Sequence, residues 1–154
     1  MANKSYFDPD IAVSLEMPVD WEAAATEHFP LLLMAPSEQA FRANLSFSVE
    51  ELDPPTPENL QLMIDQTRAD RSQTFKGFQL VSEQRMMQDN FPAHIEHYHW
   101  NMDSSHIPMT QLFALILTAP DALYGLHGTC LQSTENIYLP IFTAIIRSLR
   151  FIPH

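Results

Sequence analysis

The chain has 154 residues, of which 45% are hydrophobic and 10% aromatic, so it can bury the core of one globular domain spanning residues 1–154. Eight Lys and Arg residues oppose 19 Asp and Glu residues, which gives a formal net charge of −11. Nucleic acids and anionic membrane surfaces attract basic proteins, so this charge argues against both as partners. The single cysteine, Cys130, and the absence of an apolar leader favour a cytoplasmic location. No apolar run approaches the roughly 20 residues that cross a bilayer, so we expect no membrane insertion.

The first half of the chain predicts short strands separated by turns. Residues 1–10 are expected to form a loose lead-in. Apolar and polar residues alternate over residues 11–17, which predicts a strand, and residues 31–35 predict a buried one. Between them, the polar and alanine-rich segment 22–28 predicts a short helix or helical turn. The clearest strand is 41–50, because one of its faces is wholly apolar and the other wholly polar.

The second half predicts two helices with strands between them. Thr56 is a good N-cap and Pro57 suits the first helical position, which predicts a helix over residues 57–73. Apolar residues recur at four-residue spacing over 137–149 and predict a final helix. The strand patterns between the helices cover residues 78–87, 92–102, 109–119 and 123–131. Their hairpin-length links indicate an α+β fold with a twisted antiparallel sheet of about six or seven strands, flanked by the two helices.

The order of these segments and several of their residues resemble a known family. The segments that carry the resemblance are residues 41–49, 78–81, 92–100 with Tyr98 and Trp100, 111–115 and 145–151. They resemble the DcrB-like and PsbP-like group, which shares an α-β-α sandwich with the Ran-binding Mog-type proteins. The resemblance covers residues 10–152. It implies a single-domain α-β-α sandwich that acts as a non-enzymatic binding or assembly factor, and this fold also allows a homodimer.

Three histidines form a candidate metal site. His97 and His99 are two residues apart on a predicted strand, so their side chains point the same way, about 7 Å apart. Two imidazoles at this spacing can share a metal ion when a neighbouring strand supplies a third ligand, and His127 is the candidate. The alternative function is therefore a small-ligand or metal-binding protein that uses the His97/His99 face. Histidines also decorate exposed sheet faces without any ligand, and we expect no cofactor.

Methionine and aromatic side chains form a candidate protein-binding surface around one predicted hairpin. They are Met86, Met87, Tyr98, Trp100 and Met109. Met-rich aromatic surfaces adapt to varied apolar partners, and Tyr and Trp dominate interface energies. These residues either line a concave sheet face that grips a peptide or helix, with Tyr98 and Trp100 as anchors, or pack in the core.

Catalysis is not predicted, because the sequence offers no pairing of a nucleophile with a base. Cys130 and His127 are three residues apart on one predicted strand and therefore face opposite sides. Acidic residues such as Glu50 and Glu51 lie at predicted turns and strand ends, where carboxylates are normally solvated. The leading prediction is a non-catalytic protein-binding module. It would act as an adaptor or a chaperone-like assembly factor that binds an apolar segment of another protein.

Overall fold

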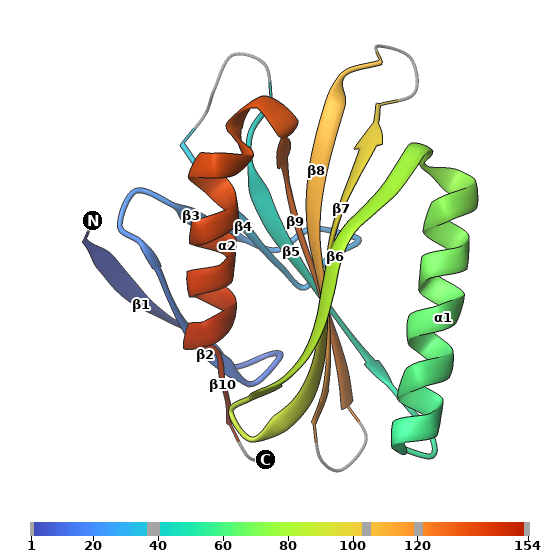
Figure 1. Cartoon of the computed structure of the whole chain (residues 1–154). Coiled ribbons are helices and arrows are strands. Elements are labelled where there is room, and N and C mark those ends of the chain that lie inside the picture. The colour runs from blue at the N-terminus through green and yellow to red at the C-terminus, as the bar shows by residue number, and fades with distance from the viewer. Residues whose placement is uncertain (1, 37–40, 103–105, 119–121, 153–154) are drawn as a thin grey trace.

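A seven-stranded antiparallel sheet separates the two helices of the chain (Figure 1). The computed structural model describes residues 2–36, 41–102, 106–118 and 122–152. In spatial order the strands are β3 (Glu22–Ala24), β4 (Leu31–Met34), β5 (Asn44–Glu51), β9 (Ala122–Leu131), β8 (Pro108–Thr118), β7 (Phe91–Asn101) and β6 (Lys76–Gln88). The turn between β6 and β7 has Asp89 and Asn90 at positive φ, which matches the twist of an antiparallel hairpin.

Each face of the sheet is covered by a different layer. Helix α1 (Pro57–Thr74) lies on one face, and α2 (Glu135–Ser148) lies on the other, as Figure 1 shows. A second sheet flanks α2, with the strand order β1 (Asn3–Asp8), β2 (Val13–Pro18) and β10 (Arg150–Phe151). A short 3₁₀ turn, Gln132–Thr134, leads from β9 into α2. The chain is therefore an α+β protein with the predicted α-β-α sandwich.

The pleat of β7 decides which of its side chains meet which helix. Ala93 and Ile95 belong to the core between the sheet and α2, whereas Tyr98 belongs to the core beneath α1. Because successive side chains of a strand alternate between faces, His97 and His99 project toward α2. Glu96 and Tyr98 project toward α1 for the same reason.

Both helices form close to their predicted positions. The Oγ1 atom of Thr56 accepts a hydrogen bond from the backbone N–H of Asn59 at 3.2 Å, so Thr56 is the N-cap of α1. Helix α2 begins at Glu135, two residues before its predicted start, and this places the Glu135 carboxylate in its first turn.

Two predictions in the first half of the chain are wrong. Residues 1–10 are not a loose lead-in, because Asn3–Asp8 form β1, which pairs along its whole length with β2. Residues 22–28 are not a helix, because Glu22–Ala24 pair with β4 as strand β3. In both places, pairing with a neighbouring strand overrides a weak local pattern. The last residue of the predicted strand 109–119, Ala119, lies outside the described residues, and β8 ends at Thr118.

Candidate functional site

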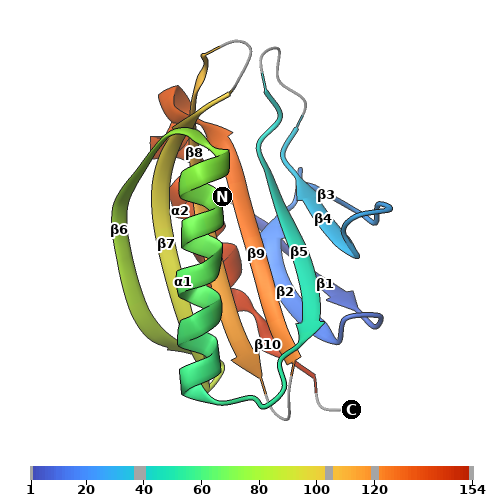
Figure 2. The same cartoon turned by 90° about the vertical axis from the view of Figure 1, so that its right-hand side faces the viewer.

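Helix α1 covers only part of its face of the sheet. Arg68 and Arg71 of α1 contact Glu96 of β7, so the helix is held over the β6–β7 side. Figure 2 shows β5 and β9 beside the helix rather than beneath it. A cleft of about 460 Å³ follows this boundary between α1 and the strands β8, β9 and β5.

The cleft combines an apolar floor with polar walls. Its apolar lining comes from Phe29, Phe75, Phe113 and Leu115, and its polar lining includes Asn44, Ser46, Ser48, Glu50, Asp70, Gln111, His127 and Thr129. Gly125 keeps the floor open, since a Cβ atom at this position would lie 2.7 Å from the Ser48 Oγ atom. The volume falls within the range of about 300–1,000 Å³ that is typical of ligand pockets.

Gln111 lines the cleft and carries a hydrogen-bond acceptor that is not used within the described residues. Its Nε2 group donates to the Thr129 Oγ1 atom at 2.8 Å. Its Oε1 atom is buried and has no hydrogen-bond partner among the described side chains and backbone. Gln111 is only 7% exposed, so leaving this oxygen unpaired costs free energy. A bound N–H group in the cleft would remove that cost.

A buried charge network closes the cleft on the α1 side. The side chain of Glu96 is fully buried and accepts a hydrogen bond from the Arg68 Nε group at 2.7 Å, and it also contacts Arg71. The Arg71 guanidinium lies 4.2 Å from the ring centroid of Phe113. Burial raises the pKa of Glu96, but its 3.3 Å contact with His94 Nε2 and the two arginines outweigh this effect, and the net shift of the pKa is downward. The Glu96 carboxylate is therefore held ionised at neutral pH.

His127 does not join the other two predicted metal ligands. Its ring packs on Phe113 at a centroid distance of 4.7 Å, on the α1 face of the sheet. His97 and His99 project to the opposite face, so the predicted His97–His99–His127 site is wrong. The register explains this, because Leu112 stands opposite both His97 and Gly128, and His127 stands opposite Phe113. Burial, with a smaller contribution from Arg71, lowers the pKa of His127 to about 4.

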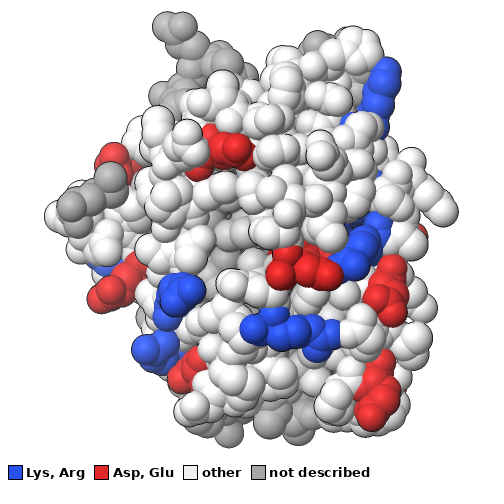
Figure 3. Space-filling model, in the orientation of Figure 1, with Lys and Arg blue, Asp and Glu red and all other residues white. Residues whose placement is uncertain are grey.

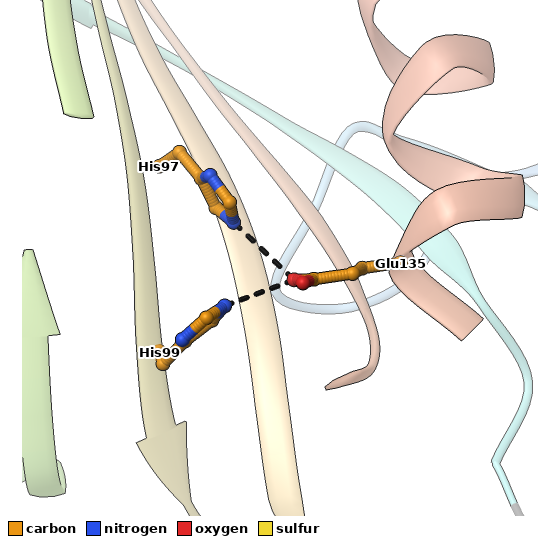
Figure 4. Close-up of side chains that lie close together, drawn as sticks. All are labelled: His97, His99 and Glu135. Atoms are coloured by element: carbon orange, nitrogen blue, oxygen red, sulfur yellow. Dashed lines mark hydrogen bonds and ion pairs between the residues drawn. The ribbon is translucent and has the colours of Figure 1, made fainter. Parts of the chain in front are cut away.

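The third side chain that lies beside His97 and His99 is Glu135, and not His127 as predicted. Figure 4 shows His97 and His99 reaching from β7 toward the Glu135 carboxylate at the start of α2. The Glu135 Oε2 atom lies 2.9 Å from His99 Nε2 and 3.4 Å from His97 Nε2. The same oxygen accepts a hydrogen bond from the Thr110 hydroxyl at 2.6 Å. The three side chains are 17–22% exposed, so the cluster lies at the edge of the core.

The surroundings of this cluster favour neutral His97 and ionised Glu135. Burial lowers the pKa of His97 more than the nearby Glu135 carboxylate raises it. Burial raises the pKa of Glu135, but hydrogen bonds from Thr110 and His99 and the charges of both histidines lower it overall. Neutral imidazole and ionised carboxylate are the forms that bind metal ions.

The predicted Met and aromatic surface is not a single surface. Tyr98 and Met109 are fully buried, and Trp100 stacks on Phe75 at a centroid distance of 4.6 Å. Met86 packs against the core on the α2 side, whereas Met87 is 61% exposed. Tyr98 and Trp100 are therefore packing residues and not the exposed anchors that the sequence predicted. The core interpretation holds for these two and for Met109.

The sequence did contain a signal for the cleft, in the polar face of the predicted strand 41–50. Ser46 is buried and Ser48 is half-buried, although polar strand residues are normally solvated. Gln111 is a second signal, since it is an amide in a strand that is mostly apolar. As predicted, Cys130 and His127 face opposite sides of β9, with Cys130 in the core on the α2 side.

On the face shown in Figure 3, Lys and Arg lie near Asp and Glu, and most of the surface is uncharged. No helix within the described residues is long and apolar enough to span a membrane.

Comparison with known proteins identifies the fold and no closer relationship. No protein-family model matches the chain, and no curated protein matches it. LpqN of Mycobacterium tuberculosis, described as involved in cell envelope biogenesis, superposes with a TM-score of 0.74 at 12% identity, over 99% of this chain and 91% of that one.

Two further solved structures cover nearly the whole chain. Cyanobacterial PsbP (CyanoP) from Synechocystis sp. PCC 6803 has a TM-score of 0.70 at 15% identity, over 97% of this chain and 92% of that one. The Saccharomyces cerevisiae Ran-binding protein Mog1p has a TM-score of 0.63 at 11% identity, over 99% and 96%. The chain thus has the fold of the PsbP-like and Mog-type proteins, which confirms the resemblance at the level of the fold.

Proposed function

We propose that this protein is a non-catalytic protein-binding module, an adaptor or chaperone-like assembly factor that holds an apolar segment of a partner protein in the cleft beside α1. The observation that carries the proposal is the buried Gln111 Oε1 atom, which has no partner among the described residues of a cleft with an apolar, largely aromatic floor. A backbone N–H of an extended segment would satisfy this oxygen. The apolar side chains of the segment would pack on Phe29, Phe75 and Phe113.

Acidic residues at the rim of the cleft determine which residues are favoured on either side of the bound apolar segment. Glu50 on β5 and Asp70 on α1 line the cleft and are exposed. With the net charge of −11, these carboxylates favour a segment with Lys or Arg next to its apolar residues. A protein described as Ran-binding shares the fold, which supports a protein as the partner. We retain the cytoplasmic location and the homodimer as predictions that are independent of the cleft.

Selection of peptides from a random library on the purified full chain tests this proposal. The proposal expects peptides with an apolar centre and basic flanks. Ser48→Phe would fill the cleft without removing a core side chain and should weaken their binding at least tenfold. Leu62→Ser is the matched control, because Leu62 is 56% exposed and does not line the cleft.

Charge reversal at the rim provides a second test that leaves the floor of the cleft intact. Glu50→Lys with Asp70→Lys changes two exposed side chains, so the variant should fold like the parent chain. It should weaken the basic-flanked peptides and spare neutral ones. Peptides that bind Ser48→Phe and the parent chain equally well would overturn the proposal, as would a selection that yields no peptide.

A further inference from the structure

We propose that His97, His99 and Glu135 form a site for one divalent transition-metal ion, with Zn²⁺ as the ion of best fit. One ligand atom from each residue lies within 4.8 Å of the other two. The site lies on the α2 face of the sheet and is separate from the cleft beside α1. It does not depend on the proposed protein-binding function.

The distances match a metal site after a small adjustment. Ligand atoms bonded to Zn²⁺ at 2.0–2.1 Å with tetrahedral angles are about 3.3 Å apart. His97 Nε2 and Glu135 Oε2 are 3.4 Å apart, which already fits. His99 Nε2 and Glu135 Oε2 are 2.9 Å apart, so their separation needs to grow by about 0.4 Å.

An unused nitrogen points to a ligand at this site. His97 Nε2 is buried and makes no hydrogen bond with the described residues, since its contact with Glu135 lacks hydrogen-bond geometry. A buried imidazole nitrogen without a partner is costly, and a metal ion would give it one. His97 is in β7 and Glu135 is at the start of α2, so regular elements position both ligands.

The Thr110 hydroxyl supplies the outer contact that metal-binding carboxylates usually have. It donates to Glu135 Oε2 at 2.6 Å and so fixes the orientation of this carboxylate. Two imidazoles and one carboxylate leave the fourth tetrahedral position to water, and the 17–22% exposure of the three side chains gives the ion access. Imidazole ligands favour Zn²⁺ over Mg²⁺ and Ca²⁺, which prefer oxygen.

A second group of possible metal ligands has similar spacing, but its surroundings are unfavourable for a cation. Ligand atoms of Glu83, His94 and Glu96 also lie within 4.8 Å of one another. However, Glu83 and Glu96 both contact Arg68, and Arg71 contacts Glu96 as well. These guanidinium groups already neutralise the carboxylates and would repel a cation. The His97 cluster has no such cation among its described contacts.

Calorimetric titration of the purified full chain with ZnCl₂ alone, in metal-free buffer, tests the site. We expect one ion per chain and a rise in the melting temperature with Zn²⁺. His97→Asn, His99→Asn and Glu135→Gln should each weaken binding at least tenfold and abolish that rise. His28→Asn is the matched control because His28 is exposed and lies elsewhere in the chain.

Co²⁺ gives a readout that does not depend on stability. Bound tetrahedrally, it should produce visible d–d absorption in the parent chain and in His28→Asn, and none in His99→Asn. Circular dichroism establishes that each variant is folded, and Glu135→Gln is nearly isosteric in case a histidine variant fails to fold. The proposal would be overturned by an absence of stoichiometric binding, by full binding in the site variants, or by loss of binding in His28→Asn.

Discussion

Glu96 and His97 are consecutive residues of β7, yet their side chains belong to opposite layers of the sandwich. Glu96 is fully buried beneath α1 in contact with Arg71, whereas His97 points to Glu135 of α2. The alternation of a strand thus places an ion-pair network and a candidate metal site on the two sides of one short segment.

Glu96→Gln should destabilise the chain by about 3 kcal/mol, because it leaves the charge of Arg71 uncompensated in the core. Urea denaturation measures this loss. Adding Arg71→Met to Glu96→Gln should recover part of it, since the pair of changes removes both charges. A single-variant loss below about 1 kcal/mol would show that the buried charges are solvated or compensated by other groups.

His127 should make the protein less stable in mild acid. Burial lowers its pKa to about 4 in the folded state, whereas a histidine in the unfolded chain has a pKa of about 6.5. Between these values the unfolded state binds a proton that the folded state does not. Stability therefore rises with pH across this window and is lost as the pH falls from about 6.5 to about 4. The slope from this one proton is about 1.4 kcal/mol per pH unit.

Comparison with His127→Gln isolates this effect. His97 also has a lowered pKa and contributes in the same direction in both chains. Glu96, whose pKa is lowered from 4.5, contributes stability that is lost as the pH falls below about 4.5, and it does so in both chains. Urea midpoints at a series of pH values should give a shallower slope for His127→Gln between about pH 4 and 6.5. Parallel curves for the two proteins would contradict the buried neutral state of His127.

Gln111→Met should affect binding and stability in different ways. The substitution removes the buried Oε1 atom that lacks a partner in the described structure, together with the hydrogen bond to Thr129. Because an unpaired buried oxygen is destabilising, the free energy of unfolding should change by less than about 1 kcal/mol. The affinity for a cleft-binding peptide should fall about tenfold if the oxygen accepts a backbone N–H, a loss of about 1.4 kcal/mol. A large loss of stability with unchanged affinity would indicate that Gln111 is purely structural.

The sequence predicts the strands, helices and layers of this fold better than it predicts which side chains of different elements come into contact. Alternation in residues 92–102 correctly places His97 and His99 on one face, because the period of a strand is a local property. The position of His127 depends on the register between β7, β8 and β9, which no single strand encodes. A register shift of one residue would move every side chain of a strand to the other face. This is why His127 was predicted as a ligand but lies on the α1 side.

The start of α2 and the burial of Ser46 and Ser48 are likewise not determined by the local sequence pattern alone. Glu135 was missed because the final helix was predicted to begin at residue 137, and helix ends are poorly defined by pattern alone. The alternation of residues 41–50 does not reveal that Ser46 is buried and Ser48 half-buried, because the partial coverage of the sheet by α1 depends on tertiary packing. That coverage is fixed by the contacts of Arg68 and Arg71 on α1 with Glu96 on β7, which lies 25–28 residues farther along the chain.

Two glycines of β9 provide a matched pair for testing the two faces of the sheet. A Cβ atom on Gly128 would lie 2.7 and 2.8 Å from ring carbons of Phe142, which is fully buried in α2. A Cβ atom on Gly125 would lie 2.7 Å from the Ser48 Oγ atom, which rotation of the serine side chain can move, and in ordinary contact with Leu115 at 3.8 Å. Replacement of glycine by alanine should therefore lower the free energy of unfolding more at position 128 than at position 125.

Gly128→Ala should lower the free energy of unfolding by about 1–3 kcal/mol, because the ring of Phe142 has no free volume to enter. Gly125→Ala should cost less than about 1 kcal/mol, since alanine suits a strand better than glycine and the contact is relieved locally. Phe142→Leu combined with Gly128→Ala should cost less than the sum of the single changes. Equal urea midpoints for the two alanine variants would mean that α2 moves freely over β9, which would contradict the close packing of this layer.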